Sequence, residues 1–289
     1  MSPLESRRNR QGSKPSEILV RNLGTIFIMW NTIFYQPLVN ALIFFYQFLG
    51  QNLGLAIIGL TLFIRGALTP LTLPSLKSAQ KLKSLQPELA KLKSKYSKDK
   101  QQFAQKQLEF YKKHGVNPAS GCLPQIVQIV ILIALFQAFN QVLKPEGNIV
   151  ETLNNLLYQG LKLSKEFTLN TKFLYLDLTQ PDLFVIKDIK FLKYTINRLP
   201  GLFLIAAAVA QFLSSKLMMP AAKATKEQTK KTKEETDDMA AAMQSQMLYM
   251  MPLMTIFIGF KFPSGLVLYW LTFSVFMLIQ QPYLKNKQL

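Results

Sequence analysis

Five long stretches without Asp, Glu, Lys or Arg constrain this chain of 289 residues more than any other feature. They are residues 22–64, 115–143, 199–215, 239–260 and 262–284. A hydrocarbon core about 30 Å thick needs roughly 20 apolar residues in a helix, and most of these stretches reach that length. A water-soluble protein would not leave so many long segments uncharged. The sequence therefore predicts an all-α, polytopic membrane protein.

Composition excludes several classes of chemistry. The formal net charge of +18 would suggest a nucleic-acid partner in a soluble protein. Here most Lys and Arg residues lie in loops beside the expected spans, where they orient the chain and meet anionic lipid headgroups. The single cysteine, Cys122, excludes an intramolecular disulfide, and with the single histidine, His114, it excludes the usual Cys/His zinc site.

Nothing in the sequence indicates an enzyme. His114 lies in a Lys-rich connection beside Gly115, which is a poor place for the buried base of a Ser/His/Asp triad. No glycine-rich phosphate loop is present. We therefore expect no catalytic residue, no metal and no cofactor.

The charge-free stretches predict five core spans. We place them at residues 52–74, 121–142, 199–219, 240–260 and 264–282. They are flanked by a basic N-terminal segment (1–22), an outer loop (143–198), a cytoplasmic loop (220–239) and a tail (283–289). The last two spans are joined by only three residues, which predicts a tight helical hairpin.

Residues 23–51 form a separate aromatic stretch that also contains Asn and Gln side chains. Such residues favour the membrane interface over the bilayer centre, so we favour a helix over at least residues 34–49 lying on the outer surface. The alternative is an additional span.

Loop charges predict the orientation. Residues 75–120 are rich in Lys and hold only three acidic residues, whereas residues 143–198 hold a more balanced set. The positive-inside bias places residues 75–120 in the cytoplasm. Alternation then places residues 143–198 outside and the C-terminus inside. The basic N-terminal segment fits this scheme only if residues 23–50 also cross, which is the best support for an additional span.

The cytoplasmic loop at 75–120 carries an apolar stripe at helical spacing. Its residues are Leu82, Leu85, Leu89, Leu92 and Tyr96. A second stripe contains Phe103, Gln107, Phe110 and Tyr111, with a turn expected from Ser97 to Lys100. The spacing predicts two short antiparallel helices, a basic hairpin that catches an incoming chain or lies on anionic headgroups. The alternative is a solvated, charged loop.

Arg65 lies near the middle of the first core span, and the next charge, Lys77, is about 18 Å further along a helix. An arginine at the bilayer centre costs about 2.5–3.5 kcal/mol on insertion scales. None of the other core spans holds an acidic residue that could pair with it, but they do hold amides and hydroxyls. We therefore expect Arg65 to face a polar, hydrated cavity that attracts an anion: an ion, an anionic solute or an acidic peptide segment. The alternative is snorkelling to the interface.

Four segments resemble the YidC/Oxa/Alb family of membrane-protein insertases. The stretch LTLFIRGALTPLTLPSLKSAQKLKSLQPELAKLKSKY resembles that family's first core span and the start of its hairpin, and NPASGCLPQIVQIVILIALFQAF its second span. FLYLDLTQPD, at residues 173–182, resembles the stretch before the third span, and QMLYMMPLMTIFIGFKFPSGLVLYW resembles the fourth and fifth spans. The similarity extends over roughly residues 30–285, in the same order and topology.

The resemblance implies five core helices around a hydrophilic groove that opens to the cytoplasm and to lipid but is closed on the outer side. It places Arg65 at the family's groove arginine and Gln211 and Trp270 at groove-lining positions, to which we add Gln128 and Gln137 from the polar positions of the spans. It also implies that the first cytoplasmic loop receives substrates. The family members that it matches are short bacterial proteins of the cell membrane, without a large outer domain.

The expected function is therefore that of a membrane protein insertase and chaperone. Its expected partners are nascent membrane proteins and anionic lipid headgroups, with the Sec translocon, the signal recognition particle receptor and the ribosome as further candidates. An ion- or anion-coupled transporter that uses Arg65 is the main alternative. A structural assembly factor in which Arg65 is incidental is another. For Gln211, an interhelical hydrogen bond is the alternative to a substrate contact.

Overall fold

The computed structural model describes residues 24–25, 27–96, 99–117, 123–143, 147–191, 194–218 and 248–286. The expected basic N-terminal segment (1–22) and cytoplasmic loop (220–239) lie outside these residues. So do Cys122, the beginning of the expected fourth span and the last three residues of the tail.

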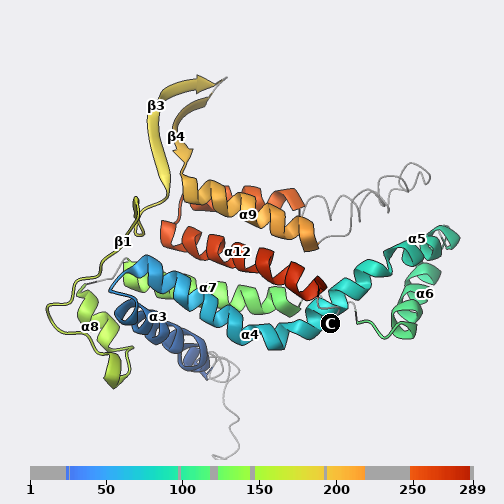
Figure 1. Ribbon diagram of the computed structural model, residues 1–289, viewed down its shortest axis with the longest axis horizontal. Helices are drawn as coiled ribbons and strands as arrows, with labels where there is room; N and C mark the ends of the chain where they lie inside the picture. Colours follow the sequence, from blue (N-terminus) through green and yellow to red (C-terminus); the bar gives the residue numbers. More distant parts are fainter. Residues whose placement is uncertain are drawn as a thin grey trace, which may run out of the picture.

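Four long helices form the body of the protein: α4 (Leu53–Ser84), α7 (Leu123–Leu143), α9 (Leu202–Met218) and α12 (Ser264–Asn286). Figure 1 shows them running side by side along the longest axis. A fifth apolar helix, Leu248–Gly259, packs closely on α9, because a Cβ atom added at Gly259 would lie 2.3 Å from the Leu204 side chain. These helices confirm the predicted fold class, a mostly helical protein of several apolar helices.

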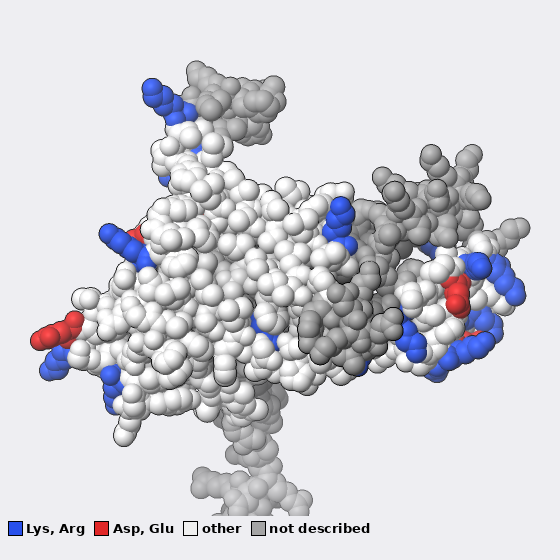
Figure 2. Space-filling model, in the orientation of Figure 1, with Lys and Arg blue, Asp and Glu red and all other residues white. Residues whose placement is uncertain are grey.

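Within the described residues, three helices are long and apolar enough to cross a membrane: Phe27–Phe48, Leu53–Ser75 and Ser264–Pro282. Three more are apolar but shorter: Ile126–Val142, Leu202–Leu217 and Leu248–Gly259. Figure 2 shows that charged side chains gather at the two ends of the long axis and leave the middle of this face largely uncharged. Such an uncharged band fits a bilayer that surrounds the middle of the bundle.

The two ends of the bundle carry different segments (Figure 1). The loop end is the end that carries the connection formed by residues 147–200. The arm end is the end that carries α5 (Gln86–Lys95) and α6 (Lys100–Lys113). Helix α4 runs from the loop end into the arm without a break, past Pro70 and Pro74. The first expected span and the start of the expected hairpin thus form one continuous helix, although each proline removes a backbone donor from it.

Side-chain packing is dense at the loop end and sparse toward the arm end. On α4, most residues from Leu53 to Thr61 are buried, and none is buried from Leu62 to Pro74. On α12, residues 264–269 are all buried, as is the preceding Pro263, whereas from 270 to 282 only Ser274 is. The buried side chains described on α7 likewise begin at Ile131 and lie toward the loop end. The hydrophobic core therefore occupies about one half of the bundle.

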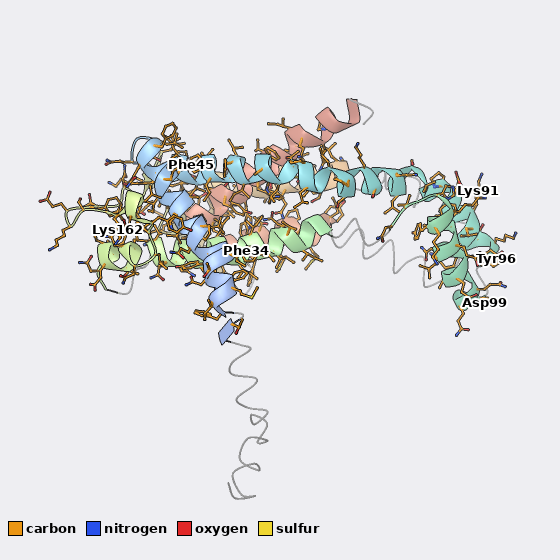
Figure 3. All side chains as sticks on the ribbon, turned by 90° about the horizontal axis from the view of Figure 1, so that it is seen from below. Phe34, Phe45, Lys91, Tyr96, Asp99 and Lys162 are labelled. Atoms are coloured by element: carbon orange, nitrogen blue, oxygen red, sulfur yellow. The ribbon has the colours of Figure 1, made fainter. Side chains whose placement is uncertain are left out.

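The arm contains the predicted apolar stripe. Asp99 caps α6, because its Oδ1 accepts a hydrogen bond from the Gln102 backbone N–H at 2.9 Å. His114 Nε2 lies 3.6 Å from Glu88 Oε2 and joins the end of α6 to the beginning of α5. Figure 3 shows the arm, with Lys91, Tyr96 and Asp99 labelled, extending beyond the rest of the bundle.

The connection at the loop end contains strands that the sequence analysis did not predict. Its elements are α8 (Ile149–Asn154), η3 (Gln159–Leu161), β1 (Lys172–Phe173), β2 (Leu176–Asp177), β3 (Leu183–Phe191) and β4 (Tyr194–Pro200). β1 pairs with β2 and β3 with β4, both antiparallel, and Leu183 lies opposite Pro200. Figure 1 shows the β3–β4 hairpin projecting away from the helices. Because β4 runs to Pro200, α9 begins at Leu202, three residues after the expected start of the third span.

Helix α3 (Gln36–Phe48) follows a short π-helix, η1 (Asn31–Tyr35), and runs obliquely to α4 in Figure 3. Its buried side chains Val39, Leu42, Ile43 and Tyr46 join the main hydrophobic core. Tyr46 is also hydrogen-bonded to the connection, because its hydroxyl accepts from the Asn170 backbone N–H at 2.8 Å. These contacts fix α3 against the loop end of the bundle.

Candidate functional site

Arg65 lies on α4 where the densely packed part of the bundle ends. Its Cζ is 3.9 Å from the centroid of the Phe273 ring on α12, so the ring face covers the guanidinium. Its Nη2 is buried and has no hydrogen-bond partner within the described part of the chain. A buried, unpaired polar group is costly, and a buried charge more so. The guanidinium therefore presents one donor group that lacks an acceptor among the described residues.

Tyr269 and Gln128 complete the surroundings of Arg65. The Tyr269 hydroxyl interacts electrostatically with the guanidinium and accepts a hydrogen bond from Gln128 Nε2 at 2.6 Å. Gln128 Oε1 is buried and has no partner among the described residues. Because Gln128 is on α7 and Tyr269 on α12, three helices meet at this polar group.

Polar side chains continue from Arg65 toward the arm end. Thr69, one turn further along α4, donates its hydroxyl to the Arg65 carbonyl at 2.7 Å and accepts a hydrogen bond from Gln280 Nε2 at 2.8 Å. The neighbouring Gln281 Nε2 is buried and unpartnered among the described residues. The arm halves of α4 and α12 thus share a second polar contact, which lies on the arm side of Arg65.

The other predicted groove residues do not converge on Arg65. Gln137 Oε1 accepts a hydrogen bond from Trp30 Nε1 at 2.7 Å, and therefore joins α7 to the N-terminal helix. Gln211 Oε1 accepts from the Thr255 hydroxyl and joins α9 to the Leu248–Gly259 helix. Trp270 is partly buried against the main core. Of the predicted set, Gln128 is the residue that the structure connects to Arg65.

Tyr269, Phe273 and Gln280 were not among the predicted site residues. They lie on α12 at positions i, i+4 and i+11, which is one helix face, and that spacing was readable in the sequence. Aromatic residues at helical spacing are common in membrane spans, however, so the spacing alone did not single out this face. Only the contact with Arg65 and Thr69 identifies it.

The arm residues that were predicted to capture substrate are partly buried within the arm itself. Leu85, between α4 and α5, is buried, with 8% of its surface exposed. The other residues of the stripe are half-buried: Leu82, Leu89, Leu92 and Tyr96. Packing of α5 against α6 therefore occupies part of the apolar surface that the sequence analysis assigned to substrate capture.

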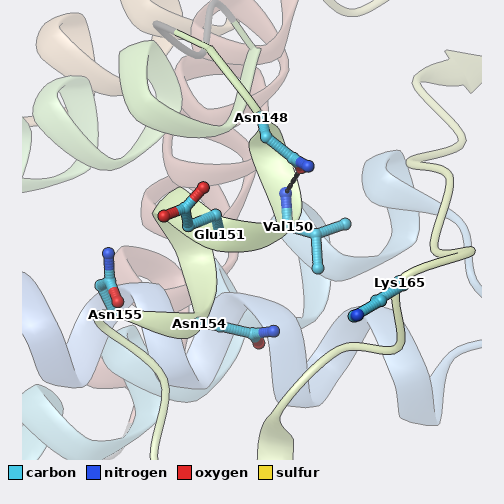
Figure 4. Close-up of a pocket in the computed structure, with 6 residues that line it drawn as sticks. All are labelled: Asn148, Val150, Glu151, Asn154, Asn155 and Lys165. Atoms are coloured by element: carbon cyan, nitrogen blue, oxygen red, sulfur yellow. Dashed lines mark hydrogen bonds between the residues drawn. The ribbon is translucent and has the colours of Figure 1, made fainter.

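A hollow of about 490 Å³ lies in the connection at the loop end. Figure 4 shows the residues that line it: Asn148, Val150, Glu151, Asn154, Asn155 and Lys165. Asn148 caps α8 through its bond to the Val150 N–H, and Asn154 is bonded to both the N–H and the carbonyl of Leu163. These amides stabilise the connection itself, so the hollow is not the candidate site.

Comparison with known proteins gives the family. Residues 44–289 match the family model described as "60Kd inner membrane protein". The chain is 35% identical over 236 residues to the membrane protein insertase YidC of Fusobacterium nucleatum, over 82% of this chain and 87% of that one. It is 32% identical to the membrane protein insertase YidC 2 of Bacillus anthracis, over 90% and 83%. It is 30% identical to the insertase MisCA of Bacillus subtilis, over 89% and 79%.

These relatives are named as insertases and not for a chemical reaction, which agrees with the expectation that the chain is not an enzyme. Among the described residues no group of three or more His, Cys, Asp or Glu side chains could hold a metal ion. The match covers every helix of the bundle from α4 onward, together with the polar group around Arg65. The chain belongs to the 60Kd inner membrane protein family, the family of the YidC insertases.

Proposed function

We propose that this protein is a membrane protein insertase that receives nascent membrane proteins in a groove beside Arg65 and releases them laterally into lipid. The observation that carries the proposal is the Nη2 of Arg65, which is buried and has no hydrogen-bond partner among the described residues. It lies where the packed half of the bundle gives way to the open half, in a chain whose relatives are named insertases.

The proposed groove is formed by Arg65 and Gln128 with their neighbours Tyr269 and Phe273. It opens toward the arm end, where α4 and α12 bury few residues. Gln137, Gln211 and Trp270 border it by holding the surrounding helices together. The Lys-rich arm supports a cytoplasmic arm end, and the loop end and its connection are then on the outer side.

Substrate capture is proposed to begin at the arm. The exposed Lys side chains of α5 and α6 attract anionic headgroups and acidic segments of an incoming chain, and the half-buried stripe from Leu82 to Tyr96 offers apolar contact. The polar end of the substrate then enters the groove, where Arg65 offsets part of the desolvation of an acidic group. The membrane potential adds about 2.3 kcal/mol per charge for each 100 mV crossed.

Release follows from the difference between lipid and the polar groove as environments for the substrate. The apolar segment of the substrate is better solvated by lipid than by the polar groove, so it moves out between the helices into the bilayer. The groove shortens the apolar path that polar groups of the substrate must cross. No nucleotide or metal is required for these steps.

Helix α3 is proposed to lie at the outer interface and not to cross the bilayer as a separate span. Near its beginning, Gln36 Nε2 donates a hydrogen bond to the Leu156 carbonyl of the connection, and near its end the Tyr46 hydroxyl accepts one from the Asn170 N–H of the connection. Both ends of the helix therefore meet residues at or near the loop end, as expected for a helix that lies along the interface. The Sec translocon, the signal recognition particle receptor and the ribosome remain predicted partners from the family resemblance.

The proposal is tested by inserting a single-span substrate with a short acidic outer segment into proteoliposomes that hold the protein. We expect Arg65→Ala to lower the insertion rate about tenfold, equivalent to about 1.4 kcal/mol, and Arg65→Lys to retain most of it. Lys216→Ala is the matched control, because Lys216 is exposed in the last turn of α9.

Two outcomes would overturn this assignment. Solute flux that depends on Arg65, with insertion unchanged, would show an anion transporter. Full insertion by Arg65→Ala with several substrates would show that the arginine is incidental to the function. If Arg65→Lys and Arg65→Ala lose insertion equally, the site requires the geometry of the guanidinium group and not simply a positive charge.

A further inference from the structure

The segment FLYLDLTQPD, residues 173–182, crosses the loop end of the bundle and contacts three of its helices. We call it the clasp. The function proposed above leaves it without a role, although it contains a carboxylate, Asp182, of which only 2% is exposed. A buried carboxylate requires hydrogen-bond partners, and its partners show what the clasp holds.

Asp182 binds the beginning of α9. Its Oδ2 accepts a hydrogen bond from the Leu204 backbone N–H at 2.8 Å, and its backbone carbonyl accepts from the Gly201 N–H at 2.8 Å. A Cβ atom at Gly201 would lie 1.7 Å from Asp182 Oδ1, so only glycine allows this approach. The carboxylate thus caps the helix and faces the positive end of its dipole.

Tyr175 supports the same cap from within the clasp. Its hydroxyl donates to Asp182 Oδ1 at 2.9 Å and accepts from the Phe203 backbone N–H at 3.2 Å. Burial is the main cause that raises the pKa of Tyr175 above its ordinary value, so the hydroxyl keeps its proton and remains a donor to the carboxylate. Together the two side chains satisfy two free N–H groups in the first turn of α9.

The clasp also binds the beginning of α12. The Ser264 N–H donates to the Gln180 carbonyl at 2.8 Å, and the Gly265 N–H to the Leu178 carbonyl at 3.2 Å. The Ser264 hydroxyl donates to the Asp177 carbonyl at 3.0 Å. Backbone carbonyls of the clasp therefore take the place of a side-chain cap for α12.

Helix α4 is held by apolar contact with the same segment. The Phe173 ring lies so close to Gly54 that a Cβ atom there would be 2.2 Å from it. Leu176 and Leu178 of the clasp are buried in the main core. One segment of ten residues is thus in contact with the loop ends of α4, α9 and α12.

We propose that the clasp is the fixed outer seal of the groove, and that Asp182 is a positioning residue that holds α9 against α12 and α4. This inference rests on the function proposed above, which places the loop end outside. A groove with a hydrated arm half must be closed on its outer side, because an open path would let protons and ions cross. The clasp closes it by using three helix ends as its attachment points.

The first test measures proton leak, which does not depend on insertion. The protein is reconstituted in proteoliposomes that contain a pH-sensitive dye, and proton entry is followed under an imposed potential. Asp182→Ala should raise the leak about tenfold, because the Leu204 N–H at the start of α9 and the Tyr175 hydroxyl lose their acceptor and the sealed state becomes less populated. Glu166→Ala, an exposed carboxylate of the same connection, should leave the leak unchanged.

Tyr175→Phe keeps the test decisive if Asp182→Ala does not fold. It removes one donor to Asp182 and one acceptor for α9 while the ring remains, so we expect a smaller rise in the leak. Leak at the wild-type level in a folded Asp182→Ala or Tyr175→Phe protein would overturn the seal. Failure of the proposed function would appear separately, as normal insertion by Arg65→Ala.

A crosslink distinguishes a fixed seal from a moving gate. Asn52→Cys combined with Lys172→Cys, with Cys122→Ser, would join the start of α4 to the residue before the clasp upon oxidation, because the Asn52 side chain already contacts the Lys172 carbonyl at 3.2 Å. We expect the oxidised protein to insert the acidic substrate at the rate of the reduced protein. Loss of insertion that a reductant restores would show that the clasp opens during transport, and would overturn the fixed seal.

Discussion

The two halves of α4 belong to one helix but lie in different environments. Leu60, in the loop half, exposes 2% of its surface, whereas Leu71, in the arm half, exposes 64%. Arg65 lies between them. The loop half is packed against α3, α7 and α12 as in the core of a globular protein, and the arm half is left open. The comparison indicates that the bundle has a densely packed loop half and an open arm half.

Polar groups show the same division. At the loop end, buried polar groups such as Asp182 and Asn40 have hydrogen-bond partners. Among the described residues, the buried polar atoms without a partner are on Arg65, Gln128 and Gln281, at the boundary or in the arm half. A satisfied polar network makes a structure rigid and specific, and an unsatisfied one can bind a ligand. This difference supports the proposal that the open half receives the polar groups of a substrate.

The largest expected effect comes from the packing contrast on α4. Leu60→Ala should lower the free energy of unfolding by about 2–5 kcal/mol, because the surrounding core cannot fill the cavity. Leu71→Ala, the matched change in the arm half, should stay within about 0.5 kcal/mol. Unfolding in detergent, followed by circular dichroism, measures both. Equal effects of the two changes would show that the two halves are packed alike.

An intermediate effect is expected at the boundary. Tyr269→Phe removes the oxygen that accepts from Gln128 and faces Arg65, which should cost about 1–3 kcal/mol and reduce insertion of an acidic substrate several-fold. Tyr158→Phe, at a half-exposed tyrosine of the connection, is the control. Combining Tyr269→Phe with Gln128→Leu should be less than additive. Strict additivity would mean that the two side chains act separately.

The smallest expected effect is the response of the loop end to acid. Burial opposes the charged form of Asp177, but hydrogen bonds from Thr179 and Thr171 outweigh it, so the pKa of its carboxyl lies below the ordinary value. A lowered folded pKa gives stability that is present above the unfolded pKa of about 3.9 and is lost as the pH falls through the folded value. The unfolding temperature should therefore decrease between about pH 4 and pH 2.

Asp177→Asn provides the control for this acid response. It retains the side-chain size but removes the titrating group, so the decrease below about pH 4 should be smaller than in the unmodified protein. Superimposable pH profiles of the two proteins would show that this carboxyl does not contribute to the acid stability of the loop end.

Much of the fold could be read from charge and hydropathy. The charge-free stretches predicted helices at α4, α7, α9, Leu248–Gly259 and α12, and each is found. The strands β3 and β4 were not predicted. Apolar and polar residues alternate only loosely along residues 183–200, and the expected outer loop that holds most of them was assigned from its charge. The apolar part of α4 is Leu53–Ser75, against an expected span of 52–74, and the helix itself continues past Pro70 and Pro74 to Ser84.

The candidate site could be predicted only in part. Arg65 was identified because a charge in the middle of an apolar span is unusual whatever surrounds it. Gln137 and Gln211 looked equivalent to Gln128 in the sequence, but their amides are bonded to Trp30 and Thr255. A side-chain amide in a span can either form a hydrogen bond to a neighbouring helix or line a cavity. Spacing along one helix does not show which neighbouring helix the amide faces.

The sequence by itself determined the membrane class, the order of the apolar helices and the place of Arg65 near the middle of one of them, because these depend on where charges and apolar residues stand along the chain. The tertiary structure decided which side chains surround that arginine, which half of the bundle is packed, and that one ten-residue segment holds three helix ends. These features depend on contacts between residues far apart in the chain, such as Arg65 with Phe273 and Asp182 with Leu204. Such contacts arise only when the helices pack together, so no local pattern in the sequence records them.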